Sequence, residues 1–573
     1  MRRLLRNALY ICGVGALCLT PLQASTSSLA DAVMRGDKET VRAALKSGAD
    51  VNAAQGDGMT ALHWAALKND AEVARMLIKA GANVTATTRL GGYTPLLLAA
   101  RNGSVAVIDE LVTAGANPNA ATTNGTTALM MAAAAGRADG VRALLDHGAD
   151  ANAKEVRGET ALMFAAASGR VDAIKVLASR GAEVDATMRA VDLTVTEQAM
   201  QEPAGATTGK NINENESAGA ATAKYANGAE PAGRTRRGQK VNPYNLLVAA
   251  QGGLTPLLFA SREGHVEAAT ALLDAGAVVN KPSAGDGTTP LLMATINGNF
   301  DLAKLFLDKG ADPRIASENG VTPLFAAVNC YWSPRAAYPQ PRAFEQQRMS
   351  YLELMSALLD KGADPNARVN KKPWYSGYNF DRSGIDEAGA TTFWRAAYAG
   401  DVDAMRLLVA RGADPYIPTM KSPVRAGAAN ETQRAAGKDQ SGLPPIPVGG
   451  PDVPALHAAA GVGYGVGYSG NSHHYSPNGV LPAVKYMVEE LHMDVNATDS
   501  LGNNAIHHAA ARGDTEMVLY LVAKGANPLL VNREGLTTVD MANAPVQKTT
   551  PFPDTIAVLE KMGAKNNHKC MSC

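Results

Sequence analysis

A short string recurs along most of this 573-residue chain, and its spacing limits what the chain can fold into. The strings TALHWAA, TPLLLAA, TALMMAA and TALMFAA begin at Thr60, Thr94, Thr127 and Thr160, at spacings of 34, 33 and 33 residues. Further copies begin at Thr255, Thr289, Thr322, Thr391, Pro454, Asn504 and Thr537. A fixed period of this length indicates units that stack on their sequence neighbours instead of packing around one centre.

Each unit carries signals for two helices. A glycine such as Gly58, Gly125 or Gly158 permits a turn with positive φ, and the threonine two residues later can cap a helix with its hydroxyl. The alanine pair that follows leaves little side-chain bulk, so neighbouring helices can approach closely. A second amphipathic stretch then ends at a glycine, as at Gly81. One such pair cannot bury both helices, and we expect stacked pairs to share a continuous core.

These strings resemble the ankyrin repeat, whose signature is TPLHxA at a 33-residue period. The resemblance implies an all-α solenoid of stacked helix-turn-helix units joined by β-hairpin loops, with several long loop insertions in this chain. Counting a leading unit from about Ser27 and a degenerate last one, we find 12 units. At the fourth signature position the resemblance implies histidines that brace the turn, at His63, His457 and His507.

Departures from the period locate the insertions. From Thr160 to Thr255 is 95 residues, and the surplus lies in a tract at 191–252, rich in Ala, Gly, Thr, Asn and Glu, that is typical of a disordered segment. About five units precede it (25–190) and about seven follow it (253–567). Shorter insertions are expected near 330–348, 369–388, 421–452 and 461–480.

The first 24 residues have the pattern of a secretory signal peptide. Three arginines precede an apolar run from Ala8 to Leu19, which is shorter than the roughly 20 residues that span a bilayer. A small-residue exit follows, and we predict a mature N-terminus at Ser25. The sequence therefore predicts a periplasmic or secreted protein without a membrane-inserted segment.

Charge and motif content exclude several function classes. Lys plus Arg and Asp plus Glu both total 54, so no global field favours nucleic acid. The string Gly465 to Gly470 matches GxGxxG but lacks the preceding strand that a dinucleotide site needs, and the adjacent His473 and His474 have no third convergent ligand. We expect a non-enzymatic, monomeric scaffold without a cofactor or metal, which binds an unidentified protein partner.

The ankyrin resemblance also implies where that partner binds: on a concave surface made of hairpin tips and first helices. We expect the contacts to come from variable tip residues and from two insertion loops that carry tryptophan. These protein-binding candidates are Thr88, Arg89, Thr123, Asn124, Glu155, Arg157, Ser317, Glu318, Asn319, Trp332 and Trp374.

Aromatic residues leave a second interpretation open. Of the 29 aromatic residues, 12 fall between Tyr331 and Tyr398. They either attach the long loops to the repeats or form a surface for a partner or a small ligand, with a pocket expected among Trp332, Tyr351, Trp374 and Trp394.

The C-terminal tail, 568–573, leaves a third interpretation open. It ends in CMSC, so Cys570 and Cys573 form a CxxC pair that could be a disulfide, a redox pair or the remnant of a haem attachment site C-x-x-C-H. The histidine of that haem motif is missing. The alternative function is therefore an exported redox or electron-transfer accessory protein.

Overall fold

The computed structural model describes residues 29–194, 248–332, 342–373, 375–376, 379–380, 385–422, 439–464, 475–544 and 550–568. The predicted signal peptide, most of the 191–252 insertion, Trp374, the GxGxxG string with His473 and His474, and the terminal cysteines lie outside these residues.

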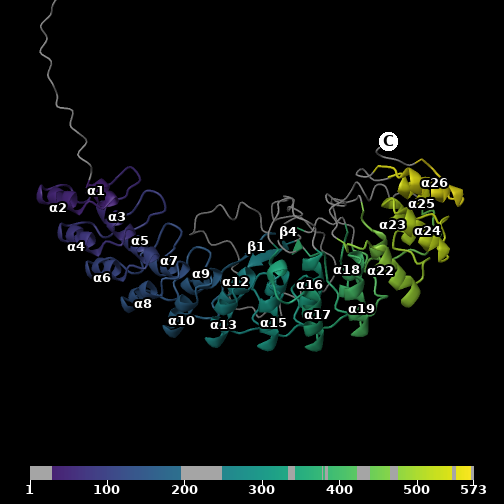
Figure 1. The fold of residues 1–573 in the computed structure, drawn as a ribbon, viewed down its shortest axis with the longest axis horizontal. Coiled ribbons are helices and arrows are strands. Elements are labelled where there is room, and N and C mark those ends of the chain that lie inside the picture. Colours follow the sequence, from purple (N-terminus) through teal and green to yellow (C-terminus); the bar gives the residue numbers. More distant parts are fainter. Residues whose placement is uncertain are drawn as a thin grey trace, which may run out of the picture.

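The described helices form an arc of stacked pairs, which confirms the predicted all-α solenoid (Figure 1). One helix of each pair lines the concave edge. These inner helices are α1 (Leu29–Arg35), α3 (Ala61–Leu67), α5 (Pro95–Asn102), α7 (Ala128–Ala134), α9 (Ala161–Ala167), α12 (Pro256–Glu263), α14 (Pro290–Ile296), α16 (Pro323–Tyr331), α18 (Thr392–Tyr398), α21 (Ala455–Ala460), α23 (Ala505–Ala511) and α25 (Thr538–Ala542).

The second helix of each pair lies on the convex side. These outer helices are α2 (Lys38–Lys46), α4 (Ala71–Lys79), α6 (Val105–Thr113), α8 (Ala138–Asp146), α10 (Val171–Ser179), α13 (Val266–Asp274), α15 (Phe300–Asp308), α17 (Tyr351–Asp360), α19 (Val402–Ala410), α22 (Leu481–Lys485) continued by a π-helical turn η4 (Tyr486–Glu490), α24 (Thr515–Ala523) and α26 (Pro553–Lys561). A 3-10 turn, η3 (Ala343–Gln346), precedes α17.

Threonine caps begin most inner helices, as the signature predicts. The hydroxyl of Thr255 accepts a hydrogen bond from the Leu258 amide (3.3 Å), and the glycine two residues before the cap has positive φ, as at Gly58 (+88°). Where proline follows the threonine, it occupies the first helical turn, which needs no amide donor. The same turn chemistry therefore positions most hairpins relative to their helices, whereas α21 and α23 are preceded by Pro454 and Asn504.

Packing runs in single file. Each inner helix packs against the inner helix of the preceding and of the following unit, from α1·α3 through to α23·α25. One apolar cluster extends from Leu29 to Ala564, and fully buried alanines such as Ala65 and Ala66 lie between the helices. Stability is therefore the sum of neighbouring interfaces.

The longest insertion leaves the stack without interrupting it. Helix α9 packs directly on α12, although nearly 90 residues separate them in sequence. The strands β1 (Ala190–Asp192) and β2 (Ala250–Gly252) pair antiparallel, with Ala190 opposite Gly252. The two strands therefore form a paired base on either side of residues 195–247. A second short pair, β3 (Tyr375–Ser376) and β4 (Asn379–Phe380), lies in the insertion after α17.

Asparagines link the units on the side of the glycine-alanine signals. Asn52 donates to the Gly81 carbonyl (3.2 Å) and accepts from the Asn83 amide (2.7 Å). Equivalent asparagines at 119, 152, 280, 366 and 496 make the same pair of bonds to the next unit. These bonds satisfy the backbone groups that the glycine turn leaves open.

Candidate protein-binding surface

The hairpin tips form a continuous row because their backbones bond to one another. The amide of Arg89 donates to the Asp57 carbonyl (2.9 Å), Val156 donates to Asn124 (3.1 Å), and Glu318 donates to Asp286 (2.8 Å). Each tip is thus held against the preceding tip. Exposed side chains on this row have fixed spacing, which suits it for contact with another molecule.

The structure divides the predicted tip residues into two groups. Arg89, Thr123, Asn124, Arg157 and Glu318 have exposed side chains, and Thr88 is half-buried. Three other tip candidates, Glu155, Ser317 and Asn319, are buried, so in this conformation their side chains offer no contact surface.

The buried candidates build the tips. The Glu155 carboxylate accepts hydrogen bonds from the amides of Arg157 (2.6 Å) and Glu159 (3.1 Å), which closes the tip turn. The carbonyl of Asn319 accepts the amide of Asn370 from the next hairpin. Glu318, between these two buried candidates, has an exposed side chain; partial desolvation raises its pKa, and the charge of Lys371 opposes that rise.

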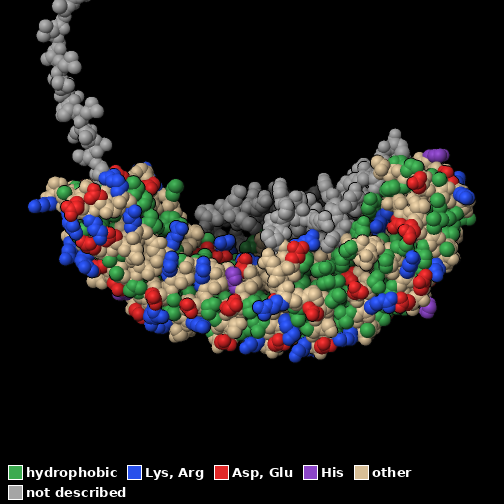
Figure 2. All heavy atoms as spheres, in the orientation of Figure 1, with side chains coloured by type: hydrophobic (Ala, Val, Ile, Leu, Met, Phe, Trp, Pro, Cys, Tyr) green, Lys and Arg blue, Asp and Glu red, His purple; other side chains and the backbone are tan. Residues whose placement is uncertain are grey.

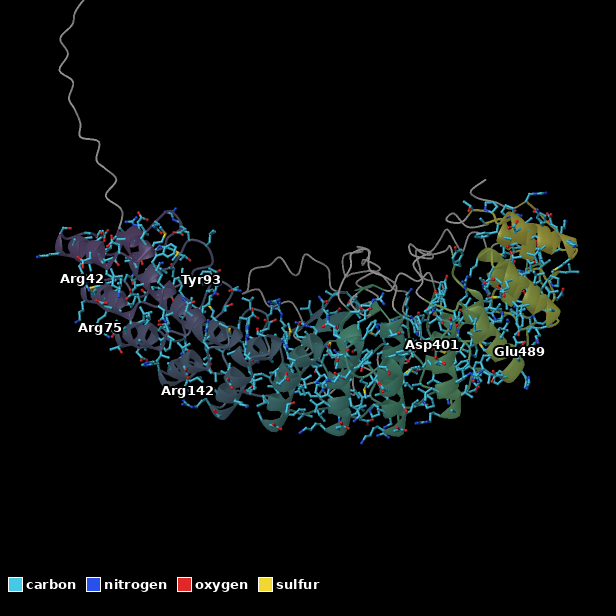
Figure 3. The ribbon with its side chains drawn as sticks, viewed as in Figure 1. Arg42, Arg75, Tyr93, Arg142, Asp401 and Glu489 are labelled. Atoms are coloured by element: carbon cyan, nitrogen blue, oxygen red, sulfur yellow. The ribbon has the colours of Figure 1, made fainter. Side chains whose placement is uncertain are left out.

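Trp332, also predicted to bind a partner, is buried and serves the fold instead. Its indole Nε1 donates to Asp401 Oδ2 (2.7 Å), and the Tyr351 hydroxyl donates to the same oxygen (2.8 Å). Asp401, labelled in Figure 3, also caps α19 by accepting the Ala404 amide (3.0 Å). One buried carboxylate thus joins the insertion after α16 to the next unit.

Other aromatic rings complete this attachment. The Tyr331 and Tyr351 rings stack with centroids 3.9 Å apart, and Phe344 stacks on Phe300 at 6.1 Å. The interpretation of these aromatics as loop attachments therefore holds for the described rings. They also border a cavity of about 760 Å³, lined in part by Tyr351, Arg342 and Phe344.

Trp394 does not line that cavity. It is fully buried at the fourth signature position, and its Nε1 donates to the Val453 carbonyl (2.9 Å). His63 makes the same contact with Tyr93 (3.0 Å), and His457 makes it with Asn503 (3.0 Å). The tryptophan therefore replaces the bracing histidine that the family resemblance implied.

Apolar exposure on the concave face varies from unit to unit, with Leu98 of α5 buried and Met293 of α14 partly exposed. At the position after the fourth signature residue, Trp64, Met131 and Phe164 are partly exposed in the N-terminal units. The equivalent Ala326 and Arg395 are buried in later units. The inner helices α3, α7 and α9 therefore present apolar surface that α16 and α18 do not.

Exposed acidic and basic side chains pair between neighbouring outer helices. Figure 2 shows basic and acidic side chains interspersed over the visible face. Arg42, Arg75 and Arg142 lie on the outer helices (Figure 3), and Arg42 and Arg75 pair with Glu72 (2.6 Å) and Glu110 (2.7 Å) of the next outer helix. Such exposed pairs contribute little to stability. The pattern does not resemble the basic stripe of a nucleic-acid site.

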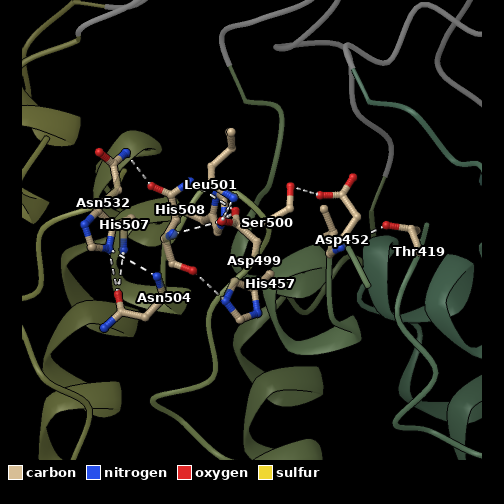
Figure 4. A network of polar contacts seen from close by, with 12 residues as sticks. Thr419, Asp452, His457, Asp499, Ser500, Leu501, Asn504, His507, His508 and Asn532 are labelled. Atoms are coloured by element: carbon tan, nitrogen blue, oxygen red, sulfur yellow. Dashed lines mark hydrogen bonds and ion pairs between the residues drawn. The ribbon is translucent and has the colours of Figure 1, made fainter. Parts of the chain in front are cut away.

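A buried polar network lies among the last hairpins (Figure 4). His508 Nε2 contacts Asp499 Oδ2 (2.9 Å), and its ring lies 5.5 Å from that of His457. Burial is the largest single influence and opposes ionisation of Asp499, but the hydrogen bond and charge of His508, with smaller contributions from His457 and Asn503, together outweigh it and lower the pKa of Asp499 to about 2. Burial lowers the pKa of His457 and of His507 to about 4. These residues are structural: the described part of the chain holds no cluster of three or more metal-ligating side chains.

Two further findings bear on alternative chemistry. Cys330 is a buried free thiol whose pKa is raised to about 12 by desolvation, so it is not poised to react. Among the helices that the structure describes, none is long and apolar enough to cross a membrane. The redox interpretation rests on Cys570 and Cys573, which lie outside the described residues, and it stays a prediction.

Comparison with protein families agrees with this architecture. A model of ankyrin repeats in three copies matches residues 29–122, 96–188 and 257–335, and a model of many ankyrin repeats matches 487–542. The chain belongs to the ankyrin-repeat family. As in ankyrin repeats generally, its paired helices and hairpins form a scaffold for protein–protein contact.

Sequence reasoning missed Arg533. Its side chain contacts residues 439–444, which precede it by about 90 positions. The repeat alignment could have drawn attention to it, because Arg533 occupies the tip position that Arg89 occupies in the second hairpin.

Proposed function

We propose that this ankyrin-repeat protein is an exported, non-enzymatic scaffold that binds a partner protein. The partner is held by the exposed hairpin tips and the open concave face of the N-terminal units. The observation that carries the proposal is the fixed row of exposed tip side chains beside the partly exposed Trp64, Met131 and Phe164. Export is supported by the sequence pattern of residues 1–24.

Capture from the native host tests the binding surface. A variant with Arg89, Thr123, Asn124 and Arg157 all changed to alanine should lose the partners that the unchanged chain captures. A matched variant with exposed convex residues Lys79, Lys175 and Glu267 changed to alanine should keep them, since these lie on outer helices. Equal capture by both variants would show that the surface is elsewhere.

Export is tested separately. Cell fractionation should place the protein outside the cytoplasm, and N-terminal sequencing of the mature chain should begin at Ser25. An unprocessed chain in the cytoplasm would refute export and leave the binding surface untouched.

A further inference from the structure

One hairpin tip already holds another segment, residues 439–444, which bends at Ser441 and Gly442 and comes from the chain itself. The Arg533 Nη1 atom donates to the Leu443 carbonyl (3.1 Å) and pairs with the Asp439 carboxylate, and Nη2 donates to the Pro444 carbonyl. The Gln440 amide donates to the Arg533 carbonyl (3.3 Å). The peptide buries the Arg533 side chain, which is only 16% exposed.

Glycines make room for this peptide. The Leu443 side chain lies 3.3 Å from where a Cβ would stand on Gly502, and the Gln440 side chain lies even closer to the equivalent point on Gly535. A larger residue at either glycine would collide with the peptide. Proline lacks an amide hydrogen, so the segment LPPIP presents acceptors in excess, which an arginine with five donors can satisfy.

The same arrangement occurs near the other end of the arc. The Arg89 amide donates to the Asp57 carbonyl (2.9 Å) just as the Arg533 amide donates to Leu501 (2.9 Å). Gly58 stands where Gly502 does, 31 residues before its arginine in both cases. Gly91 follows Arg89 by two residues, as Gly535 follows Arg533, but the second hairpin is one residue longer before its cap, and the Tyr93 ring lies against Gly91 where Gln440 lies against Gly535. All four glycines have positive φ.

This second tip is open. The Arg89 side chain is exposed, and no hydrogen bond or ion pair joins it to any described residue. Leu90 beside it is 80% exposed, so an apolar side chain is accessible next to the free guanidinium. The carboxylate of Asp57 accepts the Met59 amide (2.9 Å) and so is engaged within its own turn.

We propose that the hairpin tip formed by Gly58, Arg89, Leu90 and Gly91 binds a proline-containing segment of a partner protein. That segment carries an acidic residue four positions before an apolar residue and proline, the chemistry of Asp439, Leu443 and Pro444. The proposal rests on the proposed scaffold function and specifies its partner. The Arg89 tip would bind, in another protein, a segment of the same chemistry as the one that Arg533 binds within this chain.

The test uses the full chain and a fluorescein-labelled peptide of residues 439–447, DQSGLPPIP, in a fluorescence anisotropy titration. We expect saturable binding that Arg89→Ala weakens at least tenfold. The control Arg101→Ala removes an exposed arginine from the inner helix of the same unit and should leave binding unchanged. A peptide with Asp439→Asn should bind more weakly, and circular dichroism verifies that each variant is folded.

Three results would overturn the proposal. Binding that survives Arg89→Ala but is lost in Arg533→Ala would mean that the peptide only displaces the chain's own segment. Absence of saturable binding would mean that the open tip does not recognise this chemistry. A host partner captured by the tips but not displaced by excess peptide would likewise refute the docking chemistry while leaving the scaffold function standing.

Discussion

The buried carboxylate of Asp401 joins α19 to Trp332 and Tyr351, and replacing it provides a sharp stability test. It is 4% exposed, it caps α19, and it accepts from Trp332 and Tyr351. Removing a cap costs about 1 kcal/mol, and each buried donor left without an acceptor costs about 1–2 kcal/mol more. We therefore expect Asp401→Ala to reduce the free energy of unfolding by about 4 kcal/mol.

A matched cap isolates the aromatic contribution. Asp514 caps α24 by accepting the Met517 amide (3.1 Å), and no aromatic donor bonds to its carboxylate among the described residues. We expect Asp514→Ala to cost about 1 kcal/mol. In a Trp332→Phe background, Asp401→Ala should cost about 1–2 kcal/mol less than in the unchanged chain, because one donor no longer needs the carboxylate.

The assay combines two measurements. Urea unfolding followed by far-UV circular dichroism reports stability, and hydrogen exchange of the segments from α16 to α19 shows where it is lost, since repeat arrays open locally. Equal losses in Asp401→Ala and Asp514→Ala would refute the proposed role of the aromatic donors.

Three further predictions concern other parts of the array. Acidification from pH 6.5 towards pH 4 should weaken the C-terminal units by a few kcal/mol. The reason is that burial lowers the pKa values of His457 and His507 to about 4, so the unfolded chain takes up protons before the folded chain does. A hydrogen-exchange rate in these units that does not change with pH beyond its intrinsic dependence would contradict this. Pro454→Thr should stabilise the fold by about 1 kcal/mol, because threonine supplies the backbone amide that proline lacks. His457 Nδ1 is buried without a partner, whereas the equivalent His63 Nδ1 accepts the Thr60 amide (3.1 Å). An unchanged urea midpoint would refute this prediction. Replacing residues 194–248 by Asn-Gly should preserve the fold and raise its stability by about 2 kcal/mol through the shorter loop, measured by thermal melting; a lowered midpoint would show that the insertion contributes to the stack.

The sequence predicts the structural features that recur in every unit, but it does not predict contacts between residues that are far apart in the chain. Threonine caps, positive-φ glycines and bracing histidines follow from local chemistry that is the same in every unit. The repeat pattern predicts that Glu155 is an exposed tip residue, because the pattern does not show that its carboxylate accepts hydrogen bonds from two backbone amides of its own turn. The contacts of Asp401 with Trp332 and of Arg533 with Leu443 join segments 69 and 90 residues apart, and periodicity carries no information about them.

Single-file stacking has a mechanical consequence. In the described part of the chain, no helix pair packs tightly against a distant one, so nothing braces the two ends of the arc against each other. Small rotations at successive interfaces add up along its length. The opening between the ends can therefore widen or narrow elastically. Molecules of different width can then bind in it without disrupting the packing between any two neighbouring units.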